Sequence, residues 1–200
     1  MSKFTSAIPS PWSLVEDQVA FDCPYFRIRS DRVKDGAGAP RHYYSVRMKN
    51  FGIAVLPIDS DGNTVLVGQQ RYVLGRFTWE VIRGGGRIDM PALESAKNEL
   101  SEEAGFLAGN WLQLFEASAS PGVTDELSDG FIAWNLRAGA PHPEAHEELV
   151  RWRVPFSQAV TMALSGEIAD LASLALILGT QTKLQRGELP ADLAECVRRS

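Results

Sequence analysis

One amphipathic segment, residues 91–104, lies between two groups of strand-like segments, and this order restricts the possible folds more than any other feature of the chain. Its apolar residues recur at intervals of three and four, at Leu93, Ala96, Leu100 and Ala104. This spacing is typical of a helix with one buried face. Pro91 stands in a favourable first-turn position, and Gly105 is the type of residue at which helices end. We therefore expect a helix from Pro91 to Ala104.

The segments before this helix predict antiparallel strands. Residues 25–33 and 42–48 are rich in aromatic and β-branched residues, and the turn-forming stretch KDGAGAP separates them. They are predicted to form a hairpin. Residues 53–58 and 64–70 flank the turn DSDGN and predict a second hairpin, in which Pro57 indicates a strand end or an edge strand.

The segments after the helix predict more strands and then helices. The three strands are expected at 111–117, 131–137 and 149–154. Two helices follow, from about Phe156 to Leu164 and from about Asp170 to Leu178, and a short helix is expected over 190–199. This order indicates an α/β (α+β) fold of the α/β/α type, in which helices cover both faces of a mixed sheet.

The length of 200 residues allows one main domain with a small appendage, because two separate cores usually need a longer chain. We expect residues 1–50 to form an N-terminal antiparallel β segment that is a candidate dimerisation element. Residues 51–182 are expected to form the main domain, and residues 183–200 a C-terminal tail or short helix.

Composition excludes several classes of protein. The net charge is a modest −5 and the basic residues are dispersed, unlike the basic patch of a nucleic-acid-binding protein. No apolar run approaches a membrane span, and the N-terminal stretch lacks the apolar segment of a signal peptide. We expect a cytoplasmic protein without a nucleic-acid or membrane partner, in which Cys23 and Cys196 are free thiols. The histidines are too scattered for a histidine metal site or a Ser-His-Asp triad.

Three glutamates on the predicted helix form a candidate metal site. At about 100° of rotation per residue, Glu102 and Glu103 lie about 60° and 40° to either side of Glu99. Like charges at these spacings destabilise a helix by about a few tenths of a kcal/mol per pair, and a divalent cation would remove that cost. Carboxylate oxygens are hard ligands that favour Mg²⁺ or Mn²⁺. The alternative is a solvated acidic face.

A glycine run, Gly84-Gly85-Gly86, precedes this helix. Its lack of side chains would let phosphates or a metal ion approach the backbone closely. The alternative is a plain loop. Together, the glycines and the glutamates favour hydrolysis of a phosphoanhydride.

Residues 84–106, GGGRIDMPALESAKNELSEEAGF, resemble the Nudix box. The pattern of that box is Gly, five residues, Glu, seven residues, and then Arg-Glu-apolar-x-Glu-Glu-x-Gly-apolar. The positions that match are Gly84, Glu99, Leu100, Glu102, Glu103, Gly105 and Phe106. Met90 replaces the first Glu of the pattern, and Asn98 replaces the Arg. The resemblance implies a Nudix-type α/β/α sandwich with Glu99 and Glu103 as metal ligands.

The two departures from the box bear on catalysis. The thioether of Met90 cannot ligate Mg²⁺, and the adjacent Asp89 is the better candidate to replace the missing carboxylate. Asn98 cannot form the charged, two-pronged hydrogen bond of an arginine. Two interpretations follow, an active hydrolase and a catalytically weakened Nudix-fold module that binds a nucleotide sugar.

Most of residues 25–180 resemble ADP-ribose pyrophosphatases, including QQRYVLGRFTWEV before the box and ASASPGVTDE after it. The resemblance implies that Arg71 and Glu80 help to hold the nucleotide sugar, with Gly84 and Gly85 beside its phosphates. Those proteins have Pro and Ala between that Glu and the Gly, where this chain has Ile82 and Arg83. Arg83 either binds phosphate or is a solvated side chain.

Acidic loops supply the remaining candidates. The resemblance implies a loop glutamate as general base or metal ligand, for which Glu144 and Glu147 are the candidates. Glu126 is a candidate contact to the terminal ribose. In each case a solvated acid is the alternative.

Aromatic residues divide into two groups. Four are on predicted strands and are expected in the core, namely Trp79, Trp111, Trp134 and Trp152. Trp12, Tyr25 and Phe26 are the candidates for stacking on an adenine. The resemblance further implies a homodimer and the Mg²⁺- or Mn²⁺-dependent cleavage of a nucleoside diphosphate sugar, with ADP-ribose as the expected substrate.

Overall fold

The computed structural model describes residues 10–139 and 149–200. Contacts between residues gather in two compact units. The N-terminal unit contains the described residues up to Lys49 together with Ser120–Glu126, and the larger unit contains Asn50–Ala119 and Leu127–Ser200. Among the described residues, no helix has both the length and the apolar composition that a membrane crossing requires.

The N-terminal unit is a small antiparallel sheet built around β3 (Phe26–Lys34). On one side β3 pairs with β4 (Pro40–Met48), which confirms the first predicted hairpin. Two short strands, β1 (Ser13–Glu16) and β2 (Val19–Asp22), also pair with β3. Neither was predicted from the sequence, because strands of four residues give too little alternation to recognise.

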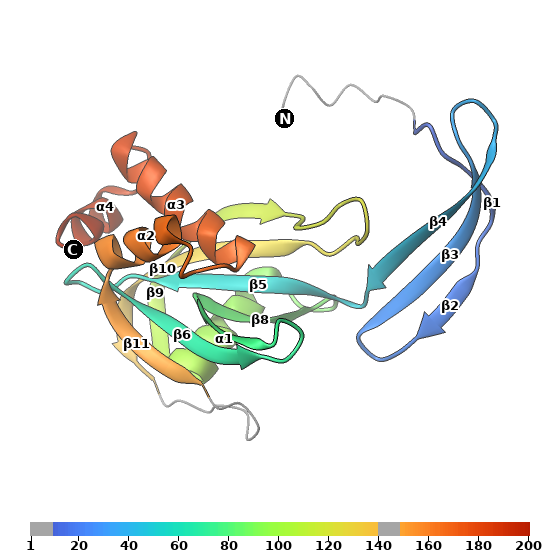
Figure 1. Cartoon of the computed structure of the whole chain (residues 1–200). Coiled ribbons are helices and arrows are strands. Elements are labelled where there is room, and N and C mark those ends of the chain that lie inside the picture. The colour runs from blue at the N-terminus through green and yellow to red at the C-terminus, as the bar shows by residue number, and fades with distance from the viewer. Residues whose placement is uncertain (1–9, 140–148) are drawn as a thin grey trace. The chain divides into compact units, whose positions relative to one another are not determined.

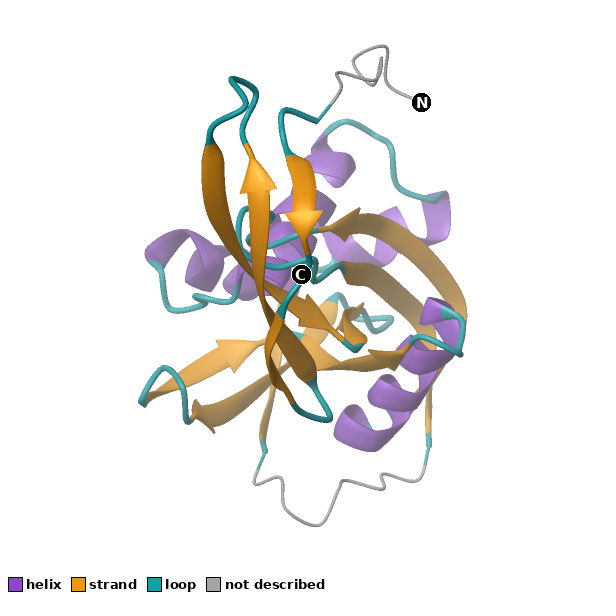
Figure 2. Cartoon of the chain, turned by 90° about the vertical axis from the view of Figure 1, so that its right-hand side faces the viewer, coloured by secondary structure: helices purple, strands orange, loops and turns teal. Residues whose placement is uncertain are grey.

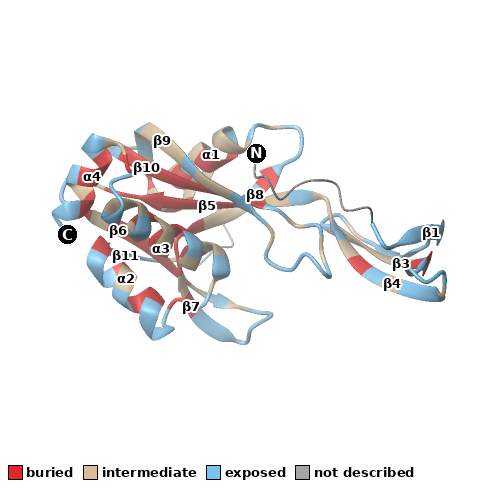
Figure 3. Cartoon of the chain, turned by 90° about the horizontal axis from the view of Figure 1, so that it is seen from above, coloured by how far each residue is buried: buried red, intermediate tan, exposed pale blue. Residues whose placement is uncertain are grey.

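The larger unit contains a four-stranded mixed sheet in the order β8-β5-β10-β9. Its strands are β5 (Asn50–Pro57), β8 (Ile82–Arg87), β9 (Phe106–Ala117) and β10 (Ser128–Ala138). The two central strands, β5 and β10, are parallel, and each outer strand is antiparallel to its neighbour. This arrangement confirms the predicted mixed sheet, and β5 and β10 are its most deeply buried strands (Figure 3).

A second, three-stranded sheet has the order β11-β6-β7. It is formed by β6 (Asn63–Arg71), β7 (Arg76–Glu80) and β11 (Val150–Pro155), all antiparallel. The predicted pairing of residues 53–58 with 64–70 is therefore wrong, although both strands exist. The DSDGN turn does form, since Asp59 N–H donates to Asn63 O at 2.9 Å. Beyond the turn the strands separate, because both edges of β5 are already occupied by β8 and β10.

Helices cover both faces of the mixed sheet (Figures 1 and 2). On one face α1 (Ala92–Ala104) packs through Ala96 and Leu100 against Ile53 and Val55 of β5. Helix α1 has Pro91 as its N-cap and ends at Gly105, whose φ of 69° is in the left-handed region that favours glycine. The predicted helix over 91–104 and its end signals are confirmed.

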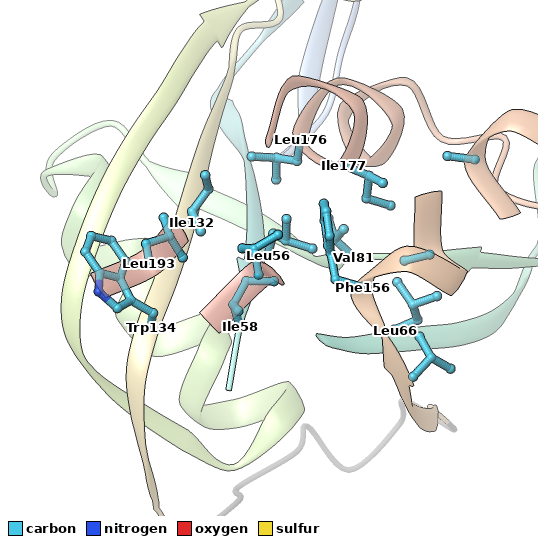
Figure 4. Packing of buried hydrophobic residues seen from close by; sticks show 14 of the residues in the cluster. Leu56, Ile58, Leu66, Val81, Ile132, Trp134, Phe156, Leu176, Ile177 and Leu193 are labelled. Atoms are coloured by element: carbon cyan, nitrogen blue, oxygen red, sulfur yellow. The ribbon is translucent and has the colours of Figure 1, made fainter. Parts of the chain in front are cut away.

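The opposite face is covered by three helices, α2 (Phe156–Ser165), α3 (Leu171–Gln185) and α4 (Ala191–Arg198). Figure 4 shows Leu56 of β5 and Ile132 of β10 packed among Phe156, Leu176 and Leu193 from these helices. Alternate residues of β5 thus contribute to two cores, as expected for a strand with both faces covered. Helix α3 continues past the predicted end at Leu178 as far as Gln185.

The four strand tryptophans are not equally buried. Trp134 is buried, whereas Trp79 and Trp111 are half-buried. Trp152 is 38% exposed, so the expectation of a core position is wrong for this residue. It lies on β11, which pairs with β6, and its ring lies 5.3 Å from that of Trp79. Aromatic packing therefore takes place partly at the surface of the three-stranded sheet.

Candidate active site

Two carboxylates of helix α1 lie against strand β8. Glu103 is only 5% exposed, and its Oε2 accepts a hydrogen bond from Arg83 N–H at 3.2 Å. One turn earlier, Glu99 lies against Gly84, where a Cβ atom would come within 1.9 Å of the Glu99 Cδ. The missing side chain at position 84 is therefore what lets the Glu99 carboxylate lie on the β8 backbone. This glycine run belongs to a strand, and the alternative of a plain loop is wrong.

The three helix glutamates are not equivalent. Glu102 is half-exposed, whereas Glu103 is buried. No group of three or more His, Cys, Asp or Glu side chains within residues 10–139 and 149–200 is arranged to hold a metal ion.

A divalent cation nevertheless fits the donors that are present. Glu99 and Glu103 present carboxylates from neighbouring turns of one helix, and the absence of a side chain at Gly84 makes room for the carboxylate of Glu99. Mg²⁺ needs only one or two protein carboxylates when water and phosphate oxygens complete its coordination. Glu99, Glu103 and the neighbouring Glu102 therefore remain candidate ligands for a divalent cation.

The two departures from the box contact each other. Asn98 Nδ2 donates to Met90 Sδ at 3.9 Å, which joins the loop before α1 to the helix. The neighbouring Asp89 forms two hydrogen bonds with Arg87, at 2.9 and 2.6 Å, and is largely exposed. These hydrogen bonds hold the pKa of Asp89 below its ordinary value. Asp89 is therefore engaged with Arg87 and joins no metal-binding cluster among the described residues.

A pocket of about 550 Å³ in the larger unit contains the predicted clamp residue Arg71. Its guanidinium donates to both oxygens of Glu80, at 2.9 and 2.5 Å. Thr78 Oγ1 donates to Glu80 at 2.6 Å. Burial acts to raise the pKa of Glu80, but the hydrogen bonds from Arg71 and Thr78 outweigh it and lower the pKa. Glu80 is thus an ionised, buried partner that fixes the position of Arg71.

Arg83 lines the same pocket. Its Nη1 donates to Ile53 O at 3.0 Å, its Nε lies 3.4 Å from Asp170 Oδ2, and its side chain is only 18% exposed. The alternative of a solvated Arg83 is therefore wrong. Asp170 is also the N-cap of α3, where it accepts hydrogen bonds from Ser173 N–H at 2.8 Å and Ser173 Oγ at 2.6 Å.

Asp170 was not recognised as a site residue from the sequence. Its position at the predicted start of a helix is typical of an N-cap. Nothing local indicates its contact with Arg83, because the two residues lie on different elements that only the tertiary fold brings together.

The remaining predicted site residue of β8 is Gly85, beside Gly84. At Gly85, no atom of the described residues lies within 4 Å of where a Cβ would be, so the backbone there is open. Glu126 belongs to the N-terminal unit, where its N–H donates to Thr124 Oγ1 at 3.1 Å. Glu144 and Glu147 lie outside the described residues. The stacking candidates Trp12, Tyr25 and Phe26 are in the N-terminal unit, and Tyr25 is 70% exposed.

Comparison with known proteins identifies relatives over most of the chain. No protein-family model matches it. It is 32% identical to the ADP-ribose pyrophosphatase of Mycobacterium tuberculosis over 162 residues, which cover 76% of this chain and 75% of that protein. It is 30% identical to the GDP-mannose pyrophosphatase of Escherichia coli K12 over 182 residues, which cover 85% of this chain and 95% of that protein.

A solved structure supports the fold. The crystal structure of an ADP compounds hydrolase matches 92% of this chain and 100% of its own chain, with a TM-score of 0.81 and 16% identity. At that identity the match concerns the fold alone. The glutamates of α1, the pocket that contains Arg71 and Arg83, and relatives that extend over most of the sequence agree with one another. The chain therefore belongs to the Nudix hydrolases, among the relatives of the ADP-ribose and GDP-mannose pyrophosphatases.

Proposed function

We propose that the protein is a metal-dependent pyrophosphohydrolase that cleaves the diphosphate of a nucleoside diphosphate sugar, with ADP-ribose as the first candidate. Water would attack one phosphorus, the anhydride bond would break, and a nucleoside monophosphate and a sugar phosphate would leave. One observation carries the proposal. Two helix carboxylates, Glu99 and Glu103, lie on β8, and the same strand supplies Arg83 to a pocket that contains Arg71.

The residues of the larger unit have distinct roles in this proposal. Glu99 and Glu103 would hold Mg²⁺ or Mn²⁺, and Glu102 would orient water or hold a further ion. When bound, such a cation polarises phosphoryl oxygens and lowers the pKa of water. Arg71 presents a planar guanidinium to phosphate oxygens, and Glu80 keeps that guanidinium in place.

Three acidic loop residues have further proposed roles. Glu144 or Glu147 would accept the proton of the attacking water, as a general base must. Glu126 would contact the terminal ribose. These assignments are supported by the resemblance to ADP-ribose pyrophosphatases. A cytoplasmic enzyme with a small-molecule partner, and with neither nucleic acid nor membrane, agrees with the dispersed charge.

A homodimer is the proposed assembly, formed through the N-terminal unit. That unit exposes an unusual number of large apolar side chains, including Leu14, Val15, Phe21, Tyr25 and Tyr44, each at least 50% exposed. Exposed apolar groups of this kind mark protein interfaces. We expect light scattering after gel filtration to give twice the chain mass of 22.0 kDa. A mass of one chain at micromolar concentration would contradict this assembly.

The proposed activity is tested by the release of AMP from ADP-ribose, followed by chromatography with Mg²⁺ or Mn²⁺ and with EDTA. GDP-mannose is assayed in parallel. Glu103→Gln is expected to lower turnover by about tenfold to a hundredfold, because it removes one of two carboxylate donors. Glu94→Gln is the matched control, since Glu94 lies on the same helix but pairs with Lys97 at 2.7 Å. Equal turnover in the two variants would contradict the assigned role of Glu103.

The alternative function, a binding module with an eroded box, makes a different prediction in the same assay. It predicts a silent wild type on a panel of nucleotide sugars together with turnover by Met90→Glu.

A further inference from the structure

We propose that Arg83 is a second phosphate-binding cation of this chain, which acts together with Arg71 on the diphosphate and exchanges its contact with Asp170 for the ligand. This inference rests on the proposed function and specifies how the protein itself recognises the diphosphate.

The geometry places both guanidinium groups on one pocket. Arg71 comes from the end of β6 and Arg83 from β8, and both line the same cavity of about 550 Å³. A ligand with two neighbouring phosphates carries charge at two points. Two separate arginines match that distribution better than one.

Arg71 is held in a fixed position and still has donors to offer. Its Nε and one Nη2 hydrogen bond go to Glu80, whereas a guanidinium has five N–H groups. Its side chain is 38% exposed, so the groups not used on Glu80 can reach a ligand. The buried Glu80 supports Arg71 from the core side.

The ion pair between Arg83 and Asp170 is longer than the ion pair between Arg71 and Glu80. The distance of 3.4 Å between its Nε and Asp170 Oδ2 exceeds the 2.7–2.9 Å typical of a strong charge-assisted hydrogen bond. The same Asp170 oxygen already accepts from Ser173 N–H and Ser173 Oγ at shorter distances. Asp170 therefore remains satisfied as the N-cap of α3 when Arg83 turns to a phosphate.

The position of Arg83 also connects the pocket with the carboxylate helix. Its backbone N–H donates to Glu103, and the next residue, Gly84, lies against Glu99. The backbone of Arg83 therefore contacts one of the glutamates, while its side chain lines the pocket. If Arg71 and Arg83 both contact the phosphates, the chain should bind a diphosphate even without a metal ion.

The experiment is titration calorimetry in EDTA with the non-hydrolysable diphosphates α,β-methylene-ADP and α,β-methylene-GDP. Arg83→Gln is the main variant, because glutamine removes the positive charge but keeps a polar side chain at this position. We expect the wild type to bind at least one analogue and Arg83→Gln to bind it about tenfold or more weakly, the effect of one charge-assisted contact. Arg87→Ala is the matched control, since Arg87 is on the same strand but outside the pocket, and its affinity should change by less than about twofold.

A second variant gives the opposite effect. Asp170→Asn keeps an N-cap that accepts from Ser173 but removes the negative charge beside Arg83, so the analogue should bind several-fold more tightly. Absence of metal-free binding by the wild type, or equal affinities of the wild type and Arg83→Gln, would overturn the inference. The proposed function would survive either result if metal-dependent release of AMP or GMP persists, and it fails by itself if that turnover is absent.

Discussion

Turnover of a nucleotide sugar should fall by roughly a hundredfold or more when Gly84 is replaced by alanine. A Cβ at this position would lie 1.9 Å from Glu99 Cδ and 2.0 Å from its Oε1, far inside van der Waals contact. The carboxylate must therefore move by more than about 1 Å, and displacements of that size at a catalytic group cost about 10²-fold in rate. The change is measured as the initial rate of AMP release from ADP-ribose with saturating Mg²⁺.

Two control variants distinguish the displacement of Glu99 from the general effect of replacing a glycine by alanine. Gly85→Ala adds a methyl group to the next residue of β8, where no atom of the described part of the chain lies within 4 Å, and should lose far less activity. Gly36→Ala is the second comparison. Gly36 lies in the N-terminal unit, and a Cβ atom there would make only ordinary contacts, the nearest at 3.6 Å. Circular dichroism must show that Gly84→Ala remains folded. A folded Gly84→Ala with the rate of Gly85→Ala would show that Glu99 does not need its place on β8.

Removal of Arg71 should lower the free energy of unfolding as well as substrate binding. Glu80 is 3% exposed, and Arg71→Ala leaves its charge without the guanidinium that satisfies both oxygens. Breaking a buried ion pair from one side costs about 3 kcal/mol or more, and the partial exposure of Arg71 favours the lower part of that range. The free energy of unfolding is measured by denaturant titration near neutral pH.

The pH dependence identifies Glu80 as the cause. Burial opposes ionisation of Glu80, but its hydrogen bonds from Arg71 and Thr78 lower its pKa below the ordinary 4.5. A lowered carboxyl pKa contributes stability above the ordinary pKa, and that contribution is lost as the pH falls through the lowered value. In Arg71→Ala burial remains and the main counter-charge is gone, so ionised Glu80 now destabilises the fold. The difference between wild type and variant should therefore shrink as the pH falls through and below the ordinary carboxyl pKa of 4.5.

The double variant Arg71→Ala/Glu80→Gln is the control for this interpretation. Glutamine keeps an oxygen that can accept from Thr78 Oγ1 and carries no charge, so the double variant should recover part of the stability that Arg71→Ala loses. A loss that is the same at neutral and acidic pH, or that Glu80→Gln does not reduce, would assign the effect to packing of the Arg71 side chain instead.

The sequence by itself determined the features that depend on neighbouring residues. Helix α1 was predicted with its ends, because apolar spacing, Pro91 and Gly105 act within a few turns. The β3-β4 hairpin was predicted for the same reason, since its turn residues lie between its strands. The shared helix face of Glu99 and Glu103 also follows from local geometry.

Only the tertiary structure decided how these elements meet. The DSDGN turn indicates that β5 and β6 reverse direction, but it cannot show that β8 and β10 occupy both edges of β5. The glycine run has a weak preference for strand, yet it forms part of β8, where Gly84 and Gly86 leave space for the side chains of Glu99 and Phe51.

The role of Arg83 in the site was also decided by the tertiary structure. The sequence left two interpretations, a phosphate ligand and a solvated side chain. The tertiary structure excludes the solvated side chain, because Arg83 contacts Ile53 O and Asp170, which belong to two other elements. Arg83 also lines the pocket that contains Arg71. Periodicity and end signals report on residues a few positions apart, whereas these neighbours are far apart in the chain, so their meeting depends on the packing of the whole larger unit.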